Sequence, residues 1–232
     1  MEEKKLIPMD GMRKLIAERM KASQDQTAQT THQVYVDMLA AGQLRQKLKE
    51  EGKKVSYNDM ILAATTHALM DHPFMNCEIT PDGIWVKDFV NMGIAVALEE
   101  GLIVPNIKNA HQMDLFEISA AAADLSKRAK EGRLKASEYR KGTFTVSNLG
   151  MMGIDSFVAI INVPEAGILA VGKITDTPVA REGEICIRPM LSLTLSYDHR
   201  INDGEPAARF LVCVKNYLEA PEKLLNAKEA KA

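Results

Sequence analysis

The sequence is poor in cysteine and has no excess of either charge, and both features exclude classes of protein. Its three cysteines, Cys77, Cys186 and Cys213, have an odd number and a wide spacing that fit neither a disulfide framework nor a zinc site. The formal net charge is -2, and acidic and basic residues are interspersed. Nucleic-acid-binding proteins usually carry a basic stripe. We therefore expect reduced, non-catalytic cysteines and no nucleic-acid partner.

Long apolar runs are also missing. No run approaches the ~18 residues of a membrane-spanning helix. The start of the chain, MEEKKLIPMDGMRK, lacks the apolar core of a signal peptide and is too acidic for a transit peptide. These absences predict a soluble, cytoplasmic protein without a membrane partner.

Several motifs of enzyme chemistry are absent as well. The sequence has no G-x-G-x-x-G and no Walker lysine pattern, which argues against a common nucleotide-binding loop. It has no G-x-S-x-G elbow, so Ser147 is a poor candidate nucleophile. No two histidines have the i, i+4 spacing of a helical metal site. We expect no metal.

The composition does allow a substantial core, because 46% of the 232 residues are hydrophobic. That length suits one large domain or two small ones. No internal repeat or low-complexity linker divides the chain. We therefore predict a single domain over residues 1–225 and a flexible polar tail over 226–232.

Apolar periodicity and capping residues predict the helices. Gly52 is expected to end one helix, and Ser56 or Asn58 to cap the next, which stops at His72-Pro73. Asp114 and Glu117 have the spacing of a capping box. A first helix should carry Met12, Leu15, Ile16, Arg19 and Met20 as a mostly apolar stripe. The predicted helices cover 10–24, about 40–51, the segment before 72–73, the segment after 114 to about 132, 137–140, and about 206–218.

Alternating or continuous apolar runs predict the strands. They cover 31–38, 84–86, 89–97, 102–107, 143–148, 157–162, 167–172 and 184–196. Because helices and strands alternate irregularly, the pattern favours a mixed sheet with helices packed on it.

The segment 191–206, LSLTLSYDHRINDGEP, is the first candidate site. Its alternating leucines predict a strand that delivers His199 to a loop, where an imidazole can take and return a proton near neutral pH. Asp203 follows one turn later, before Gly204. The alternative is that Asp203 and Gly204 only form a turn and a helix cap, with His199 on the surface. Spacing alone leaves both interpretations open.

The segment 142–153, GTFTVSNLGMMG, is the second candidate site. A strand ends in Ser147 and Asn148 and enters a glycine-rich turn. A hydroxyl there can donate to a developing oxyanion. The alternative, that both side chains make only local turn bonds, is favoured when this motif is taken alone.

Together these motifs resemble the catalytic domain of the dihydrolipoyl acyltransferases of 2-oxo acid dehydrogenase complexes. Chloramphenicol acetyltransferases are similar but more distant, because they usually have a second histidine where this chain has Asp198. The resemblance covers nearly the whole chain. It is carried by GMRKLIAERMKAS, VNMGIAVALEEGLIVPNIK, GTFTVSNLGMMGIDSF, INVPEAGILAVG, LSYDHRINDG and AARFLVCVKNYLEAPEKLL.

The resemblance implies an α/β (α+β) two-layer sandwich of mixed sheet and helices, like chloramphenicol acetyltransferase and assembled as a homotrimer. It implies an active-site channel between subunits, entered by a dihydrolipoyl group at one end and coenzyme A at the other. His199 would be the general base and Ser147 the oxyanion donor, supplied by the facing subunit. Asp203 would pair with Arg45, an ion pair that would hold the histidine loop. Asn148 and Gly204 would support these residues.

The residue types suit thioester transfer. A thiol with a pKa near 8.5 is only a few per cent ionised at pH 7, so a base at His199 would assist its attack. The tetrahedral intermediate carries a negative oxygen that Ser147 can stabilise. The scheme needs no metal and no covalent enzyme intermediate. The sequence does not identify the ligands of the coenzyme A phosphates.

Full-length relatives carry a lipoyl domain and a peripheral-subunit-binding domain ahead of this one, and we expect neither in this sequence, which would suit a catalytic core of a longer protein or a naturally short form. The dihydrolipoyl group is therefore expected from another domain or chain, and dehydrogenase components of the complex are expected partners. The trimer is expected, and a cubic or icosahedral shell is a further prediction. QTAQTTHQVYVDM favours acetyl transfer, of the pyruvate or acetoin type. Two alternatives remain: a structural core with little activity, and a free-standing acetyltransferase for a small acceptor.

Overall fold

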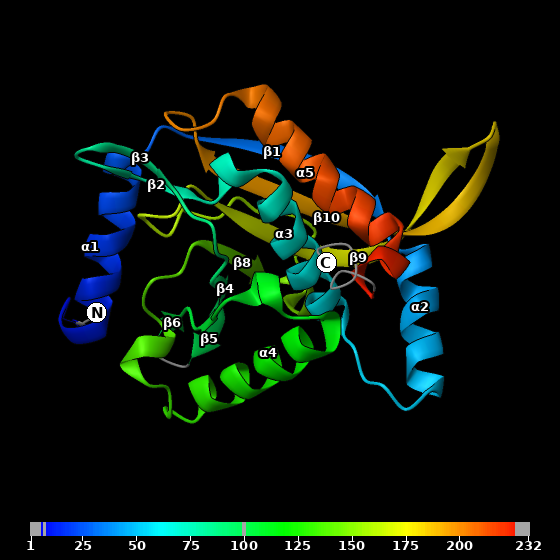
Figure 1. Ribbon diagram of the computed structural model, residues 1–232, viewed down its shortest axis with the longest axis horizontal. Helices are drawn as coiled ribbons and strands as arrows, with labels where there is room; N and C mark the ends of the chain where they lie inside the picture. Colours follow the sequence, from blue (N-terminus) through cyan, green and yellow to red (C-terminus); the bar gives the residue numbers. More distant parts are fainter. Residues whose placement is uncertain (1–5, 7, 99–100, 226–232) are drawn as a thin grey trace, which may run out of the picture.

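A six-stranded mixed sheet organises the computed structural model, which describes residues 6, 8–98 and 101–225 (Figure 1). The strand order is β1-β10-β9-β8-β4-β7. β8 pairs in parallel with β9 and with β4, and the other neighbours are antiparallel. The strands are β1 (Gln29–Asp37), β4 (Met92–Ile94), β7 (Asn106–Ile107), β8 (Phe144–Asn148), β9 (Gly167–Arg181) and β10 (Glu184–Asp198). Two small hairpins join β2 (Cys77–Thr80) to β3 (Gly83–Val86) and β5 (Val96–Leu98) to β6 (Gly101–Ile103).

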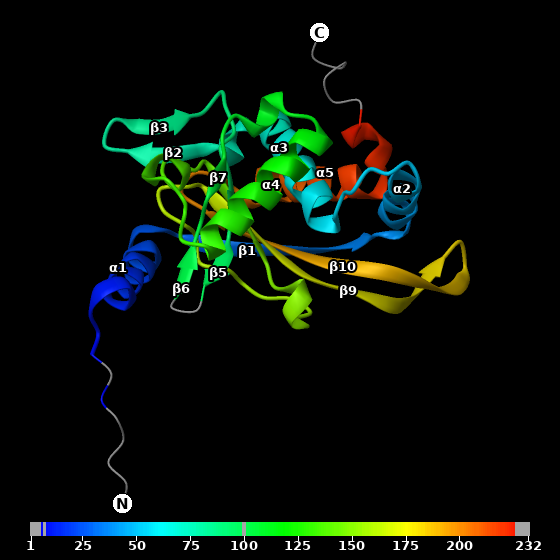
Figure 2. The same cartoon turned by 90° about the horizontal axis from the view of Figure 1, so that it is seen from below.

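Helices cover one face of this sheet, which confirms the predicted layered arrangement of mixed sheet and helices (Figure 2). The covering helices are α2 (Leu39–Glu50), α3 (Tyr57–Asp71), α4 (Leu115–Lys130) and α5 (Gly204–Glu219). α1 (Gly11–Gln26) lies to one side. Short 3₁₀ turns are η1 (Pro73–Met75), η2 (Ala110–Gln112), η3 (Ala136–Glu138), η4 (Gly150–Met152) and η5 (Pro221–Leu224). The predicted tail, 226–232, lies outside the described residues.

The inner half of β10 is buried on both faces, rather than on one as its alternating pattern predicts. Leu193 and Leu195 join the main hydrophobic core, but Thr194 and Ser196 on the opposite face are buried as well. The outer halves of β9 and β10 have the opposite character, since they are mostly exposed and project as a two-stranded arm (Figure 1).

The capping residues are confirmed. Ser56 caps α3 by accepting from the Asp59 amide at 3.1 Å, and the Asp59 carboxylate accepts from the Ser56 amide at 2.8 Å. Asp114 and Glu117 make the same reciprocal pair at the start of α4. Gly52, just past α2, has φ +77°, a left-handed conformation that glycine adopts without steric cost.

One predicted strand, 157–162, is wrong. The segment is irregular, and side chains from elsewhere satisfy its backbone instead of a strand partner. Gln29 donates to the Ala159 carbonyl at 3.1 Å and accepts from the Ile161 amide at 3.3 Å, while Ser23 donates to the Ile161 carbonyl at 2.6 Å. Apolar composition predicts burial there but not the source of the hydrogen bonds.

Other boundaries also differ from the predictions. The predicted strand 89–97 divides into β4 and β5, and 102–107 divides into β6 and β7. The predicted helix 137–140 is only the 3₁₀ turn η3, and β2 was not predicted. α1 exists, but Met12 and Leu15 of its predicted apolar stripe are exposed in the single chain.

Two glycines allow the segment after β8 to cross β9 closely. A Cβ at Gly172 would overlap the carbonyl oxygen of Asp155, and one at Gly150 would overlap the carbonyl oxygen of Gly172. Both obstacles are backbone atoms, which cannot rotate away. The crossing therefore fixes η4 against the sheet beside the end of β8.

We expect Gly172→Ala to lower the free energy of unfolding by about 3 kcal/mol or more, because the overlap forces the backbone apart. Gly204→Ala is the matched control, since its added Cβ would meet only ordinary contacts at 3.7 Å and beyond. Urea unfolding of both variants is the measurement. Equal stability of the two variants would contradict the crossing.

Candidate active site

β10 ends at a buried, fully paired aspartate. The Asp198 carboxylate accepts from Arg200 Nε at 3.0 Å and Nη2 at 2.6 Å, and from the Ala28 backbone amide at 3.2 Å. Burial disfavours its ionised form, but these hydrogen bonds outweigh burial and lower the pKa of Asp198. Asp198 therefore holds the loop that follows and is not available as a proton acceptor.

His199 is the first residue of that loop to face solvent. Its backbone amide donates to the Ala28 carbonyl at 3.0 Å, which fixes the main chain. Its side chain is 48% exposed, and Nδ1 lies 4.0 Å from Asp203 Oδ1. That separation is an electrostatic contact rather than a hydrogen bond. With Nδ1 facing a carboxylate, Nε2 is the ring nitrogen available to accept a proton.

Asp203 is the residue before α5, as the alternative interpretation proposed, but its carboxylate does not cap the helix. The side chain is 88% exposed and is oriented toward His199. The structure therefore brings His199 and Asp203 together, and the turn conformation alone does not account for the carboxylate.

Ser147 and Asn148 end β8, as predicted. Asn148 Nδ2 donates to Asn58 Oδ1 at 3.0 Å, and Asn148 Oδ1 accepts from the Gly150 amide at 2.9 Å. The bond to Gly150 is the local one expected of a turn residue, whereas the bond to Asn58 joins the end of β8 to α3, which is distant in sequence. Within the described part of the chain, Ser147 Oγ has no hydrogen-bond partner, so its hydroxyl is free to donate to a substrate.

One chain does not bring Ser147 and His199 together. Ser147 pairs with Ala170, Ala170 pairs with Thr194, and His199 follows beyond the end of β10. Two strand spacings and the rise from Thr194 to His199 separate the two Cα atoms by roughly 19 Å. No single substrate carbonyl can contact both residues of the same chain.

The predicted Arg45–Asp203 pair is wrong within a single chain. The Arg45 guanidinium lies 5.1 Å from the ring centroid of Tyr57. α2, which carries Arg45, packs near the C-terminal end of α5, where Glu219 accepts from the Asp37 amide (Figure 1). Asp203 lies at the opposite, N-terminal end of α5, and a helix of 16 residues separates its two ends by about 24 Å. A short sequence match gave no information on which end of α5 faces α2.

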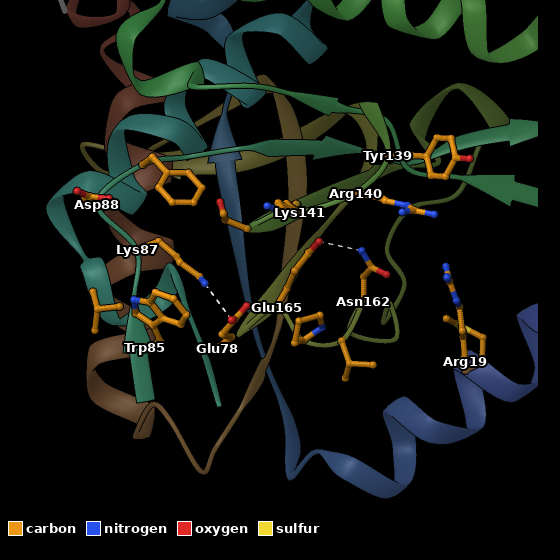
Figure 3. Close-up of a pocket in the computed structure, with 17 residues that line it drawn as sticks. Arg19, Glu78, Trp85, Lys87, Asp88, Tyr139, Arg140, Lys141, Asn162 and Glu165 are labelled. Carbon is orange, nitrogen blue, oxygen red and sulfur yellow. Dashed lines mark hydrogen bonds and ion pairs between the residues drawn. The ribbon is translucent and has the colours of Figure 1, made fainter. Parts of the chain in front are cut away.

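A cleft of about 690 Å³ contains a residue that the sequence did not indicate (Figure 3). The carboxyl group of Glu165 accepts from Thr145 Oγ1 at 2.6 Å and from Asn162 Nδ2 at 2.8 Å. Burial raises the pKa of Glu165 to about 7, although both hydrogen bonds oppose the shift. The neighbouring Ala166 carbonyl accepts from the Asp198 amide at 2.9 Å, so this cleft adjoins the histidine loop. Other lining residues are Arg19, Trp85, Lys87, Tyr139, Arg140 and Lys141.

The described residues contain no group of three or more histidine, cysteine, aspartate or glutamate side chains arranged to hold a metal ion.

Burial raises the pKa of the Cys77 thiol to about 12 and of the Cys213 thiol to about 11, opposite to the shift of a reactive cysteine. Over the same described ranges, no helix combines the length and apolarity needed to cross a membrane.

Comparison with known proteins decides the family. Residues 1–226 match the family described as 2-oxoacid dehydrogenases acyltransferase (catalytic domain). The chain belongs to the 2-oxoacid dehydrogenase acyltransferase family. The resemblance carried by the serine and histidine motifs is thereby confirmed.

Acyltransferase relatives of two acyl types align with the chain. The succinyltransferase component of the 2-oxoglutarate dehydrogenase complex of Rickettsia typhi is 40% identical over 229 residues, covering 97% of this chain and 58% of the relative. The acetyltransferase component of the acetoin cleaving system of Bacillus subtilis is 40% identical over 224 residues, covering 94% and 56%. The chain thus spans little more than half the length of these curated relatives.

Solved acyltransferase structures share the fold. A probable dihydrolipoamide acetyltransferase from Listeria monocytogenes superposes with a TM-score of 0.89 at 35% identity, covering 94% of this chain and 95% of that one. Azotobacter vinelandii dihydrolipoamide acetyltransferase gives 0.91 at 30% identity, covering 96% and 94%. A chloramphenicol acetyltransferase gives 0.54 at 19% identity, covering 93% and 100%, and shows a shared fold only.

The raised pKa of Glu165 predicts a pH dependence of stability for this acyltransferase-family chain. Unfolded glutamate ionises near 4.5 and folded Glu165 near 7, so the folded state binds more protons between these values. Stability from this group is complete below about pH 4.5 and is lost as the pH rises through about 7, by on the order of 3 kcal/mol.

Glu165→Gln should abolish that loss because the amide does not ionise: its oxygen can still accept from Asn162 Nδ2, and its NH2 can donate to the Thr145 hydroxyl oxygen in place of the bond that Glu165 accepts. Relative to wild type, the variant should gain on the order of 3 kcal/mol between pH 5 and pH 8 in urea unfolding. Glu182→Gln, at an exposed glutamate in the β9–β10 turn, is the control. Parallel pH profiles for wild type and Glu165→Gln would rule out a buried ionisation.

Proposed function

We propose that this chain transfers an acyl group between a dihydrolipoyl thiol and coenzyme A, as the catalytic core of a 2-oxo acid dehydrogenase complex. One observation carries the proposal: in a chain of this family, a half-exposed histidine faces a carboxylate at the end of a buried strand. The curated relatives are named as dihydrolipoyllysine-residue acyltransferases, which supports the same reaction.

The spacing of the candidate residues supports their roles. The Azotobacter vinelandii enzyme was studied for the role of a serine, a histidine and an asparagine in its catalytic mechanism. Those three residues have the same spacing in sequence as Ser147, His199 and Asp203. At the third position, four residues after the histidine, this chain has Asp203 where that enzyme has asparagine.

The mechanism follows from the positions of these groups. His199 Nε2 takes the proton of the attacking thiol while Asp203 stabilises the imidazolium that forms. The thiolate sulfur attacks the thioester carbonyl, and Ser147 Oγ donates to the resulting oxyanion. When the carbon–sulfur bond to the leaving thiol breaks, His199 returns the proton to that sulfur. The acyl group moves from one sulfur to the other with no net change in protons.

A second copy of the chain would complete the site. The ~19 Å between Ser147 and His199 requires each to work with its counterpart in another copy. Met151 and Met152, four and five residues after Ser147, are 99% and 77% exposed. Large apolar side chains that are exposed side by side favour an interface with another copy at this position. We propose a homotrimer with one site at each interface. A related solved structure is the cubic core of a pyruvate dehydrogenase complex, which supports a larger shell.

The acyl group is the finer part of the proposal. Relatives at similar identity are named for succinyl and for acetyl transfer, so likeness supports both donors equally. Acetyl transfer stays our prediction from the segment 26–38. The lipoyl domain and the dehydrogenase components are the proposed partners.

The first test is acyl transfer to free dihydrolipoamide from acetyl- and succinyl-coenzyme A. His199→Ala should lower kcat by about 10²–10⁴, and Ser147→Ala by about 10²–10³. Assembly should be unchanged, which size-exclusion chromatography with light scattering measures. An assembled but inactive wild type would favour the structural-core alternative. Turnover with a small non-thiol acceptor would favour the free-standing acetyltransferase.

Mixed assembly tests the shared site. Ser147→Ala and His199→Ala chains, each inactive alone, should regain about a quarter of wild-type activity when co-assembled in equal amounts, since one interface in four then has both residues. The control is a sample in which each variant is refolded and assembled separately and the two are combined only afterwards, and it should stay inactive. If co-assembled chains stay inactive, both residues act within one chain or one of them is not catalytic.

A further inference from the structure

A histidine outside the predicted site ties the catalytic loop to the sheet. His32 lies on β1, opposite Leu195 of β10. Its Nε2 is 2.9 Å from the carbonyl oxygen of Gly204 and 3.0 Å from the hydroxyl oxygen of Tyr197. Gly204 begins α5 directly after Asp203. This contact therefore joins the central sheet to the residue next to the carboxylate that faces His199.

The chemistry of the contact fixes the protonated nitrogen of His32. A carbonyl oxygen can only accept, so Nε2 must carry the ring proton and donate to Gly204. Tyr197 is fully buried, and burial, with the charge of Asp203 as a second cause, raises the pKa of its phenol. The phenol is therefore neutral, and its oxygen is a second neighbour of the same N–H.

Backbone hydrogen bonds also hold the start of this loop, where the Ile201 and Asn202 amides donate to the Asp198 carbonyl at 3.0 and 3.2 Å. The Ala28 carbonyl fixes the His199 amide, and Asn202 Nδ2 donates to the Phe74 carbonyl at 2.9 Å. Among the described residues, the Asp203 carboxylate contacts His199 at 4.0 Å, is 88% exposed and does not cap α5, while the Asp203 backbone carbonyl accepts from the Ala207 amide at 3.3 Å. The position of the carboxylate depends on the backbone on either side, and on the Gly204 side that backbone is bonded to His32.

We propose that His32 is a positioning residue, which holds Asp203 in reach of His199 by donating from Nε2 to the Gly204 carbonyl. His32 acts through the loop backbone and does not contact Asp203 or the reacting atoms. The inference rests on the proposed acyltransferase function, because it assigns His32 a part in setting the geometry of that base. The competing explanation is that His32 only stabilises the fold.

Variants at position 32 separate the two explanations. His32→Ala should lower kcat about tenfold, while KM for coenzyme A and for dihydrolipoamide changes by less than about twofold. His32→Gln should restore most of kcat, since its amide nitrogen can donate from a similar position. Tyr197→Phe should have a smaller effect, because the bond from His32 to Gly204 stays. His32→Leu fills the volume without a donor and replaces the alanine variant where that variant does not fold.

Matched controls remove the same groups elsewhere. His72→Gln removes an imidazole at the end of α3, and Tyr217→Phe removes a phenol that bonds to Asp71. Both should keep wild-type kcat. Crystal structures of wild type and the donor-free variant supply a readout that does not depend on activity, the distance from Asp203 Oδ1 to His199 Nδ1.

The outcomes of the two proposals are distinguishable. An inactive wild type in which the His32 bond is seen would overturn the acyltransferase proposal, and with it the catalytic meaning of the bond. An active wild type would leave that proposal standing and test His32 alone. The positioning role would then be overturned by a donor-free variant with wild-type kcat, by equal losses in His32→Ala and His32→Gln, or by an unmoved Asp203.

Discussion

The Asp198 carboxylate is buried where β10 ends, and the geometry of the candidate site depends on how it is paired. A buried charge without a partner would cost several kcal/mol, so the loop must keep Arg200 and the Ala28 amide in contact with it. These bonds fix the direction in which the chain leaves the strand. His199, one residue later, is therefore exposed on a backbone that is held in place. Its ring can reach a substrate without a rearrangement of the loop.

The sheet holds the two halves of the candidate site apart. Ser147 ends β8 and His199 follows β10. β9 lies between these two strands and is hydrogen-bonded to each of them. No loop movement can close this separation while the sheet is intact. Strand register thus keeps Ser147 and His199 of one chain apart, which is why the proposed function places the site between copies of the chain, beside exposed apolar side chains such as Met151.

Features set by residues close in sequence were predictable. The capping boxes at Ser56 and Asp114 depend on side chains three positions apart, and the strand leading to His199 depends on local alternation. Contacts between distant segments were not predictable. The backbone of 157–162 is satisfied by Gln29, which no local pattern reveals. The hydrogen bond from His32 to Gly204 also joins distant segments. The prediction of an Arg45–Asp203 pair was wrong within a single chain because it depended on which end of α5 lies beside α2, and local sequence does not show this.

β9 and β10 also differ in protection along their own length. Near His199 both strands have neighbours on each side and packed side chains on their faces, whereas in the projecting arm they have only each other. A two-stranded ribbon is marginally stable in water, so its amides should open to solvent without unfolding the domain. Backbone hydrogen exchange should therefore be fast at the tip of the arm and slow beside the histidine. In this fold the candidate base lies at the slow-exchanging end of the longest strands.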